Sequence, residues 1–203
     1  MQHSPLKRRQ RTGHLTAFPV IAIGASTGGP QIIDSILEAL SERGNLSCAA
    51  ILIIQHMPGL FTKRMSERLE RTYPELNIRE AKEGDKVVPG KILIAPGDHH
   101  MKIVSDRKGN ALVRITDDPV PHNLTPSIDI TMESAAETFG PKALGILLSG
   151  MGQDGARGMQ AIRAAGGETI VQDPATCVVD SMIQYTIGCD GAGVILKPKR
   201  IPD

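Results

Sequence analysis

Ser26 stands in a segment whose pattern is typical of a catalytic serine. Residues 20–23 indicate a short buried strand, and Gly24-Ala25-Ser26-Thr27-Gly28 then fits the G-x-S-x-G nucleophile elbow. Glycines on both sides let the backbone turn sharply and leave room beside the hydroxyl for a substrate. A helix after this turn would present free N–H groups and its positive dipole end, which suit a developing oxyanion. Ser26 alone could equally be a helix cap, so the interpretation needs a base and an acid at the same place.

His56 and Asp154 are the candidates for that base and that acid. They follow the ends of two apolar runs that indicate strands, residues 50–54 and 143–148. In open parallel sheets the carboxyl ends of the strands share one edge, and ligands bind there. A serine hydroxyl needs a base to take its proton, an imidazole can do so near neutral pH, and a carboxylate holds the imidazole in the right tautomer. The three residues therefore predict Ser-His-Asp acyl transfer.

Each of these residues has an alternative interpretation. His56 could be an ordinary loop histidine, and Asp154 could be only a helix N-cap. His99 and His100 are rival bases, because they follow the strand expected to end at Ala95. Asp98 beside them could suggest a metal site, but adjacent histidines point apart in an extended segment and a third ligand is missing. We therefore expect neither a metal nor a cofactor.

The segment Gly150-Met151-Gly152-Gln153-Asp154-Gly155 supports a rival of another class. It matches G-x-G-x-x-G, and Asp173 follows about twenty residues later, as in dinucleotide-binding folds. Two physical points count against this interpretation. The charge of Asp154 would repel a pyrophosphate in the turn that must hold it, and the chain left after this turn is too short for a second mononucleotide-binding half.

Apolar runs alternate with segments of helical spacing, which predicts a parallel sheet covered on both faces. The expected helices contain residues 33–40, 61–69, 127–138 and 159–162, and no element is predicted for the last twenty residues. Residues 101–105 and 111–116 predict an antiparallel hairpin. The fold class is therefore α/β: a doubly wound, mainly parallel sheet with helices on both faces and an antiparallel hairpin. The expected strands of the main sheet are residues 20–23, 50–54, 78–81, 91–95, 143–148 and 169–172.

Composition limits the class of protein and its surroundings. A net charge of +1 gives no general attraction to nucleic acid or membranes, and 2% aromatic residues argue against a stacking platform for single-stranded nucleic acid. Cys48, Cys177 and Cys189 form no C-x-x-C, which fits a reduced, cytoplasmic setting. The apolar runs are too short for membrane insertion.

The N-terminal residues differ from the rest of the chain. Residues 1–17 contain Lys7, Arg8, Arg9 and Arg11 and no acidic residue, which predicts a disordered basic tail before one catalytic domain at residues 18–203. Residues 8–25 loosely imitate a signal peptide, but cleavage after Ala25 would destroy the elbow.

Five motifs in one order make a more specific pattern than the elbow alone. Together they resemble the catalytic domain of the chemotaxis protein-glutamate methylesterases, over about residues 20–182. The motifs are Ile23-Gly24-Ala25-Ser26-Thr27-Gly28-Gly29-Pro30, Gln55-His56-Met57-Pro58, Ala95-Pro96-Gly97-Asp98-His99-His100, Pro126-Ser127-Ile128-Asp129 and Ser149-Gly150-Met151-Gly152-Gln153-Asp154-Gly155-Ala156-Arg157-Gly158.

The resemblance implies a serine hydrolase that removes γ-methyl esters from glutamates in the cytoplasmic helices of methyl-accepting chemoreceptors and deamidates receptor glutamines. It implies that Ser26 is the nucleophile, that His56 is the general base and acid, and that Asp154 orients His56. Thr27 and Met151 match positions that line the site, and we expect their backbone N–H groups to receive the oxyanion.

Members of that family usually carry an N-terminal receiver domain, whereas about nineteen residues precede the first strand here. The expectation is a free-standing enzyme, an excised domain, or an enzyme regulated by a separate protein. Two alternatives stay open: a catalytically inactive receptor-binding module of the same fold, and an esterase that acts on a different small ester.

Overall fold

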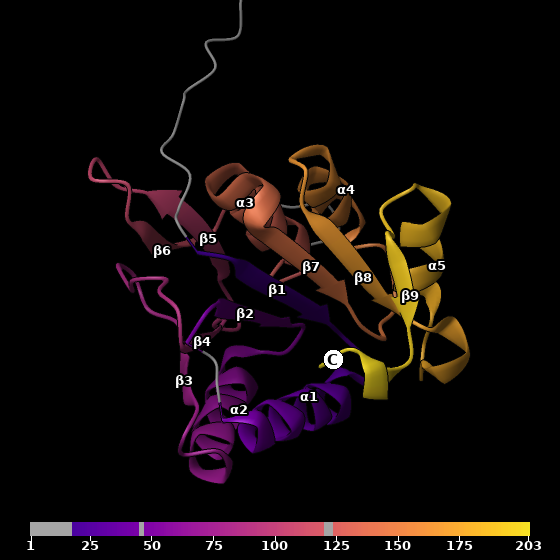
Figure 1. Cartoon of the computed structure of the whole chain (residues 1–203), viewed down its shortest axis with the longest axis horizontal. Coiled ribbons are helices and arrows are strands. Elements are labelled where there is room, and N and C mark those ends of the chain that lie inside the picture. The colour runs from indigo at the N-terminus through magenta and orange to yellow at the C-terminus, as the bar shows by residue number, and fades with distance from the viewer. Residues whose placement is uncertain (1–17, 45–46, 120–123) are drawn as a thin grey trace, which may run out of the picture.

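A computed structural model describes residues 18–44, 47–119 and 124–203 (Figure 1). The basic tail expected at residues 1–17 lies outside this range. Within the described residues, no helix is long and apolar enough to cross a bilayer.

The centre of the molecule is a seven-stranded sheet in which every pair of neighbours is parallel. Its strand order is β3-β4-β2-β1-β7-β8-β9, so β1 lies in the middle with β2 and β7 beside it. The central strands are apolar on both faces because helices cover both. The strands are β1 Val20–Ala25, β2 Ala50–Gln55, β3 Asn77–Glu80, β4 Lys91–Ile94, β7 Ala143–Leu147, β8 Glu168–Gln172 and β9 Val194–Leu196.

Helices α1 and α2 cover one face of the sheet, and α3, α4 and α5 cover the other (Figure 1). Alternate residues of β1 supply the two cores: Ile23 packs on the α1 side, and Val20 and Ala22 pack on the α3 side. The helices are α1 Gly29–Arg43, α2 Gly59–Thr72, α3 Ile128–Phe139, α4 Ala156–Ala164 and α5 Ser181–Gly188, with short 3-10 turns at Gly140–Lys142, Pro174–Thr176 and Pro198–Arg200.

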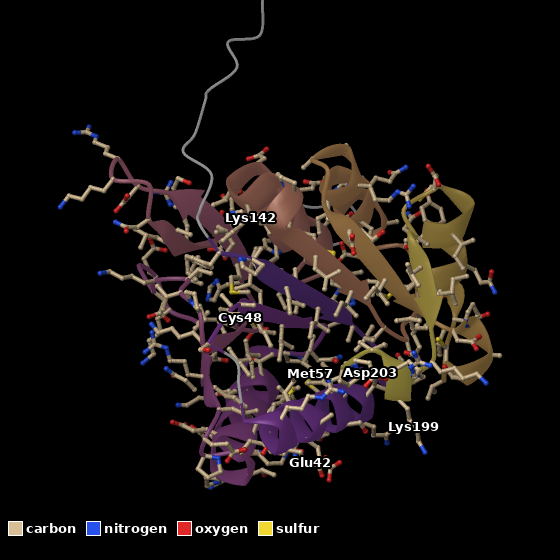
Figure 2. All side chains as sticks on the ribbon, in the orientation of Figure 1. Glu42, Cys48, Met57, Lys142, Lys199 and Asp203 are labelled. Carbon is tan, nitrogen blue, oxygen red and sulfur yellow. The ribbon has the colours of Figure 1, made fainter. Side chains whose placement is uncertain are left out.

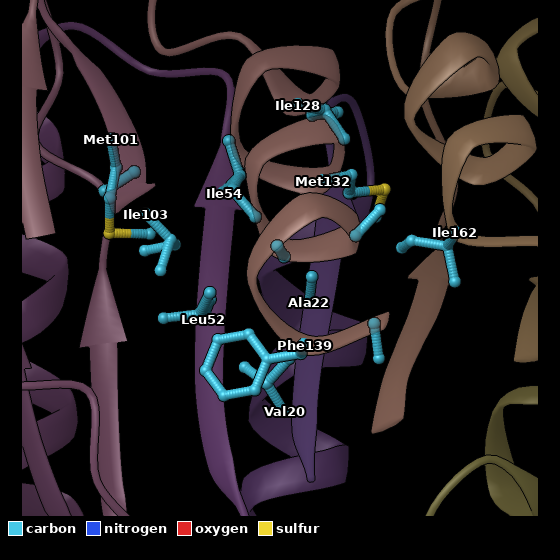
Figure 3. Close-up of a cluster of buried hydrophobic side chains, with 14 of the residues drawn as sticks. Val20, Ala22, Leu52, Ile54, Met101, Ile103, Ile128, Met132, Phe139 and Ile162 are labelled. Carbon is cyan, nitrogen blue, oxygen red and sulfur yellow. The ribbon is translucent and has the colours of Figure 1, made fainter. Parts of the chain in front are cut away.

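A separate antiparallel hairpin is formed by β5 (His100–Ser105) and β6 (Ala111–Thr116). Figure 3 shows Met101 and Ile103 of this hairpin turned toward the cluster that also contains Leu52 and Phe139. Most charged side chains lie on the outside of the molecule, and Asp203 at the C-terminus lies near α1 (Figure 2), where it pairs with Arg43.

The structure confirms the predicted fold class, including the hairpin. The sequence missed α5 and β9, which lie in or next to the unassigned last twenty residues. Strand β9 lies at the sheet edge, and Val194 and Ile195 are half exposed. Its apolar run has only three residues, which is too short to indicate a strand as the central runs do.

Candidate active site

Ser26 and His56 lie side by side, each one residue beyond the end of its strand. In the parallel pair of β1 and β2, Ala25 is opposite Gln55, and the N–H of His56 donates to the carbonyl oxygen of Ala25 at 3.0 Å. Neighbouring strands are about 4.8 Å apart, so the two turns that follow them are adjacent. The structure thus brings the first two predicted residues to one edge of the sheet. Among the described residues, the Ser26 hydroxyl makes no hydrogen bond to His56 in this conformation.

The turn that carries Ser26 is held from two sides. The N–H of Ser26 donates to the carbonyl oxygen of Ser149 at 3.0 Å, and the Ser26 carbonyl oxygen accepts from the N–H of Gly29 at 2.9 Å as α1 begins. Gly28 has a φ of 84°, which glycine adopts without strain. A Cβ on Gly150 would lie 2.7 Å from the Ser26 Cβ, so the turn after β7 borders the serine side chain closely.

His56 and Asp154 form a hydrogen bond across 98 residues of sequence. Nε2 of His56 lies 2.8 Å from Oδ2 of Asp154, and each side chain is 9% exposed. The same Oδ2 accepts from the N–H of Ile128 at 2.7 Å. The structure therefore brings the third predicted residue to the second, at the N-terminal end of α3.

Asp154 has two more donors, both on its Oδ1 atom. The N–H of Asp129 lies 3.0 Å away and the hydroxyl of Ser127 lies 3.1 Å away. Burial acts to raise the pKa of Asp154, but hydrogen bonds from His56 and from the backbone of Ile128 and Asp129 hold that pKa below its usual value. The carboxylate is therefore ionised at neutral pH, as an imidazole partner requires.

Asp129 is a residue that sequence reasoning did not single out. Its Oδ1 accepts from the N–H groups of Gly155 at 2.9 Å and Gly158 at 2.8 Å, and its Oδ2 accepts from Nε of Arg157 at 2.9 Å. Burial and the charge of Asp154 raise the pKa of Asp129. The sequence does show that Asp129 is an acidic residue in the first turn of a predicted helix. It does not show that this residue binds the start of α4, because that contact joins segments far apart in the sequence.

The rival histidines have other partners. His100 is 2% exposed, its Nδ1 accepts from the N–H of Ser127 at 2.9 Å, and burial lowers its pKa, so it supports the segment that holds Asp154 as a neutral ring. His99 is exposed and lies 2.6 Å from Oδ1 of Asp117. In the part of the chain that the structure describes, no cluster of three histidine, cysteine or acidic residues could hold a metal ion.

Thr27 directly follows Ser26 in the turn after β1, and Met151 lies in the turn after β7. Thr27 is exposed and its carbonyl oxygen accepts from the hydroxyl of Ser149 at 2.7 Å. Met151 follows Gly150, and its side chain is 63% exposed. The backbone N–H groups of both residues donate to no acceptor among residues 18–44, 47–119 and 124–203.

The geometry removes the physical basis of the dinucleotide interpretation. In that kind of site, the N-terminal N–H groups of the helix bind the pyrophosphate. Here the N–H groups of Gly155 and Gly158 already donate to the carboxylate of Asp129. Asp154 itself turns away toward α3.

Comparisons with known proteins identify the family of this chain. A family model described as CheB methylesterase matches residues 21–203. The protein-glutamate methylesterase/protein-glutamine glutaminase of Chromohalobacter salexigens is 42% identical over 189 residues, which are 93% of this chain and 51% of the relative. That of Escherichia coli K12 is 42% identical over 187 residues, 92% of this chain and 52% of the relative. The chain thus spans about half the length of the curated relatives it matches.

A solved structure gives the same result for the fold. The crystal structure of the Thermotoga maritima CheB methylesterase catalytic domain has a TM-score of 0.85 and 35% sequence identity, and the match covers 92% of this chain and 96% of that one. The chain therefore belongs to the CheB methylesterase family.

Proposed function

We propose that this chain is a protein-glutamate methylesterase and protein-glutamine glutaminase in which Ser26 is the nucleophile, His56 the general base and acid, and Asp154 the residue that orients His56. The observation that carries the proposal is the 2.8 Å hydrogen bond between His56 Nε2 and Asp154 Oδ2 beside the serine turn. The names of relatives that match over most of this chain support the same activity.

The hydrogen bond to Asp154 assigns the two ring nitrogens of His56 different tasks. Nε2 keeps its proton because it donates to an ionised carboxylate. Nδ1 is then the nitrogen with a free lone pair, and it accepts the proton of Ser26 as Oγ attacks the γ-carbonyl carbon of the substrate. This step requires the Ser26 hydroxyl to turn toward Nδ1, and the two residues lie in adjacent turns. Asp154 stabilises the imidazolium that results.

The rest of the reaction reuses the same groups. The protonated Nδ1 gives its proton to the leaving oxygen as the carbon–oxygen bond breaks, which releases methanol and leaves a glutamyl ester on Ser26. Water then attacks this ester while Nδ1 takes its proton and returns it to Ser26, which releases glutamate. A glutamine side chain follows the same path with ammonia as the leaving group, because both substrates pass through a tetrahedral intermediate.

The oxyanion of that intermediate needs donors fixed in advance. The N–H groups of Thr27 and Met151 have no acceptor among the described residues. Thr27 directly follows Ser26, and Met151 follows Gly150, which borders the serine side chain. The N-terminus of α1 adds its positive dipole end. A single donor of this kind contributes about 100- to 1,000-fold to turnover in other acyl-transfer enzymes.

The proposed substrates are methyl-esterified glutamates on the cytoplasmic helices of chemoreceptors, and a separate regulatory protein is a further proposed partner. The test is to incubate the chain with methyl-labelled chemoreceptor and to measure released methanol for wild type and Ser26→Ala. We expect release from wild type and a loss of several orders of magnitude in the variant. Full activity of Ser26→Ala would falsify the assignment.

A second measurement separates an enzyme from an inactive receptor-binding module. A fluorophosphonate labels a serine only when a base activates it. We expect labelling of Ser26 in wild type and its loss in His56→Ala. Labelling of Ser26 without methanol release from receptors would favour an esterase for a different ester.

A further inference from the structure

Gln55 connects the turn of the serine to the turn of the histidine. It is the last residue of β2 and its side chain is buried. Its Nε2 donates to the carbonyl oxygen of Ser26 at 3.0 Å and makes a longer contact, 3.4 Å, with the carbonyl oxygen of His56. One amide group thus spans both turns from inside the protein.

The other end of this amide has no donor. Oε1 of Gln55 is buried and accepts no hydrogen bond from the described part of the chain. It lies 2.5 Å from the position that a Cβ on Gly29 would take, so it packs directly against the first residue of α1. The reversed amide would direct Oε1 at two carbonyl oxygens, which repel it. The observed orientation is therefore the better of the two.

A second glutamine shows what a fully hydrogen-bonded amide at such a position looks like. Gln172 is the last residue of β8 and is also buried. Its Oε1 accepts from the N–H of Ser149 at 2.8 Å, and its Nε2 donates to the carbonyl and the hydroxyl of Thr176, both at 3.1 Å. Both ends of this amide are satisfied, so stability accounts for it. The described residues satisfy only one end of the Gln55 amide, so Gln55 should contribute less to stability than Gln172 does.

We propose that Gln55 is a positioning residue that holds Ser26 and His56 in register for proton transfer. This inference rests on the proposed function, in which His56 takes the proton of Ser26. The Ser26 carbonyl oxygen has a second donor, the N–H of Gly29, so it does not need Gln55 for satisfaction. What Gln55 adds is a link between the two turns, and a misplacement of about 1 Å between reacting groups can lower turnover by about 100-fold.

The test is Gln55→Met, which keeps the length and volume of the side chain and removes its N–H groups. On methylated receptor and on a small activated ester, we expect kcat to fall by about 10- to 100-fold with KM unchanged. The rate at which a fluorophosphonate labels Ser26 should fall in parallel. The thermal midpoint should fall less than in Gln172→Met, because the lost hydrogen bond to Ser26 is offset in part by the removal of an oxygen that has no donor.

Gln172→Met is the matched variant for stability, and it should lower the thermal midpoint because it removes three hydrogen bonds. Gln55→Asn keeps the amide but is one methylene too short to reach both carbonyl oxygens, so it should lose kcat even if the methionine variant does not fold. Wild-type kcat in a folded Gln55 variant overturns this inference alone. A wild-type chain that releases no methanol overturns the proposed function and this inference together.

Discussion

Asp154 and Asp129 cap each other's helices. Asp154, just before α4, accepts the N–H groups of Ile128 and Asp129 at the start of α3. Asp129, in the first turn of α3, accepts the N–H groups of Gly155 and Gly158 at the start of α4. The carboxylate that meets His56 is therefore fixed by two helix ends that each depend on the other.

Asp129→Asn tests this reciprocal arrangement. The amide keeps one oxygen for the α4 N–H groups but turns a donor toward Arg157, so the ion pair is lost. We expect the free energy of unfolding to fall by about 1–3 kcal/mol, as for a buried hydrogen bond to a charged group. We also expect kcat to fall, because the loop that holds Asp154 loosens. Urea denaturation and methanol release measure the two effects.

A matched control for that variant is Asp34→Asn. Asp34 also pairs with an arginine, Arg68, through two hydrogen bonds, but on the surface. Exposed ion pairs contribute about 0–1 kcal/mol to the free energy of unfolding. Equal losses in stability for the two variants would contradict a special role for the Asp129 carboxylate.

Asp154→Asn should remove most turnover without unfolding the protein. The amide can keep its oxygen in the place of Oδ1, toward the N–H of Asp129 and the hydroxyl of Ser127. Its NH2 then takes the place of Oδ2, where it meets Nε2 of His56 and loses the hydrogen bond from Ile128. This contact favours the tautomer with the proton on Nδ1, which cannot accept the proton of Ser26. We expect kcat to fall by about four orders of magnitude, the loss seen for the wrong histidine tautomer in a catalytic triad. Methanol release and circular dichroism check activity and fold.

The pH dependence of stability gives an independent test of the Asp154 environment. The pKa of Asp154 is lower in the folded protein than in the unfolded chain, where it is about 3.9. The ionised carboxylate therefore contributes its full stabilisation above that pH. This contribution is lost as the pH falls through the folded pKa. The difference in free energy of unfolding between wild type and Asp154→Asn should therefore shrink below about pH 4. Urea titrations between pH 6 and 2 measure it. A difference that is constant with pH would show that the carboxylate is not stabilised as described.

The predicted triad followed from local patterns and one rule about sheets. Apolar runs located the strands, and the parallel-sheet rule placed Ser26, His56 and Asp154 at one edge. The caps of Asp129 and the link made by Gln55 could not be predicted this way. Asp129 binds a residue 26 positions away in the sequence, and Gln55 binds one 29 positions away. Tertiary packing brings these segments together, and local sequence patterns do not encode it. His100 shows the same limit, because its neighbours in the sequence do not indicate that it is buried and bonded to Ser127.

Gly150 and Gly152 offer a matched pair that separates crowding at the serine from backbone strain. A Cβ on Gly150 would lie 2.2 Å from the Met182 sulfur and 2.7 Å from the Ser26 Cβ, so Gly150→Ala should displace the serine. A Cβ on Gly152 would meet nothing within 4 Å, but its φ of 104° makes Gly152→Ala strained. We expect kcat on methylated receptor to fall by about tenfold or more in Gly150→Ala. Gly152→Ala should mainly lower the thermal midpoint. If Gly150→Ala kept wild-type kcat and fluorophosphonate labelling, the close contact between the Gly150 turn and Ser26 would not exist in solution.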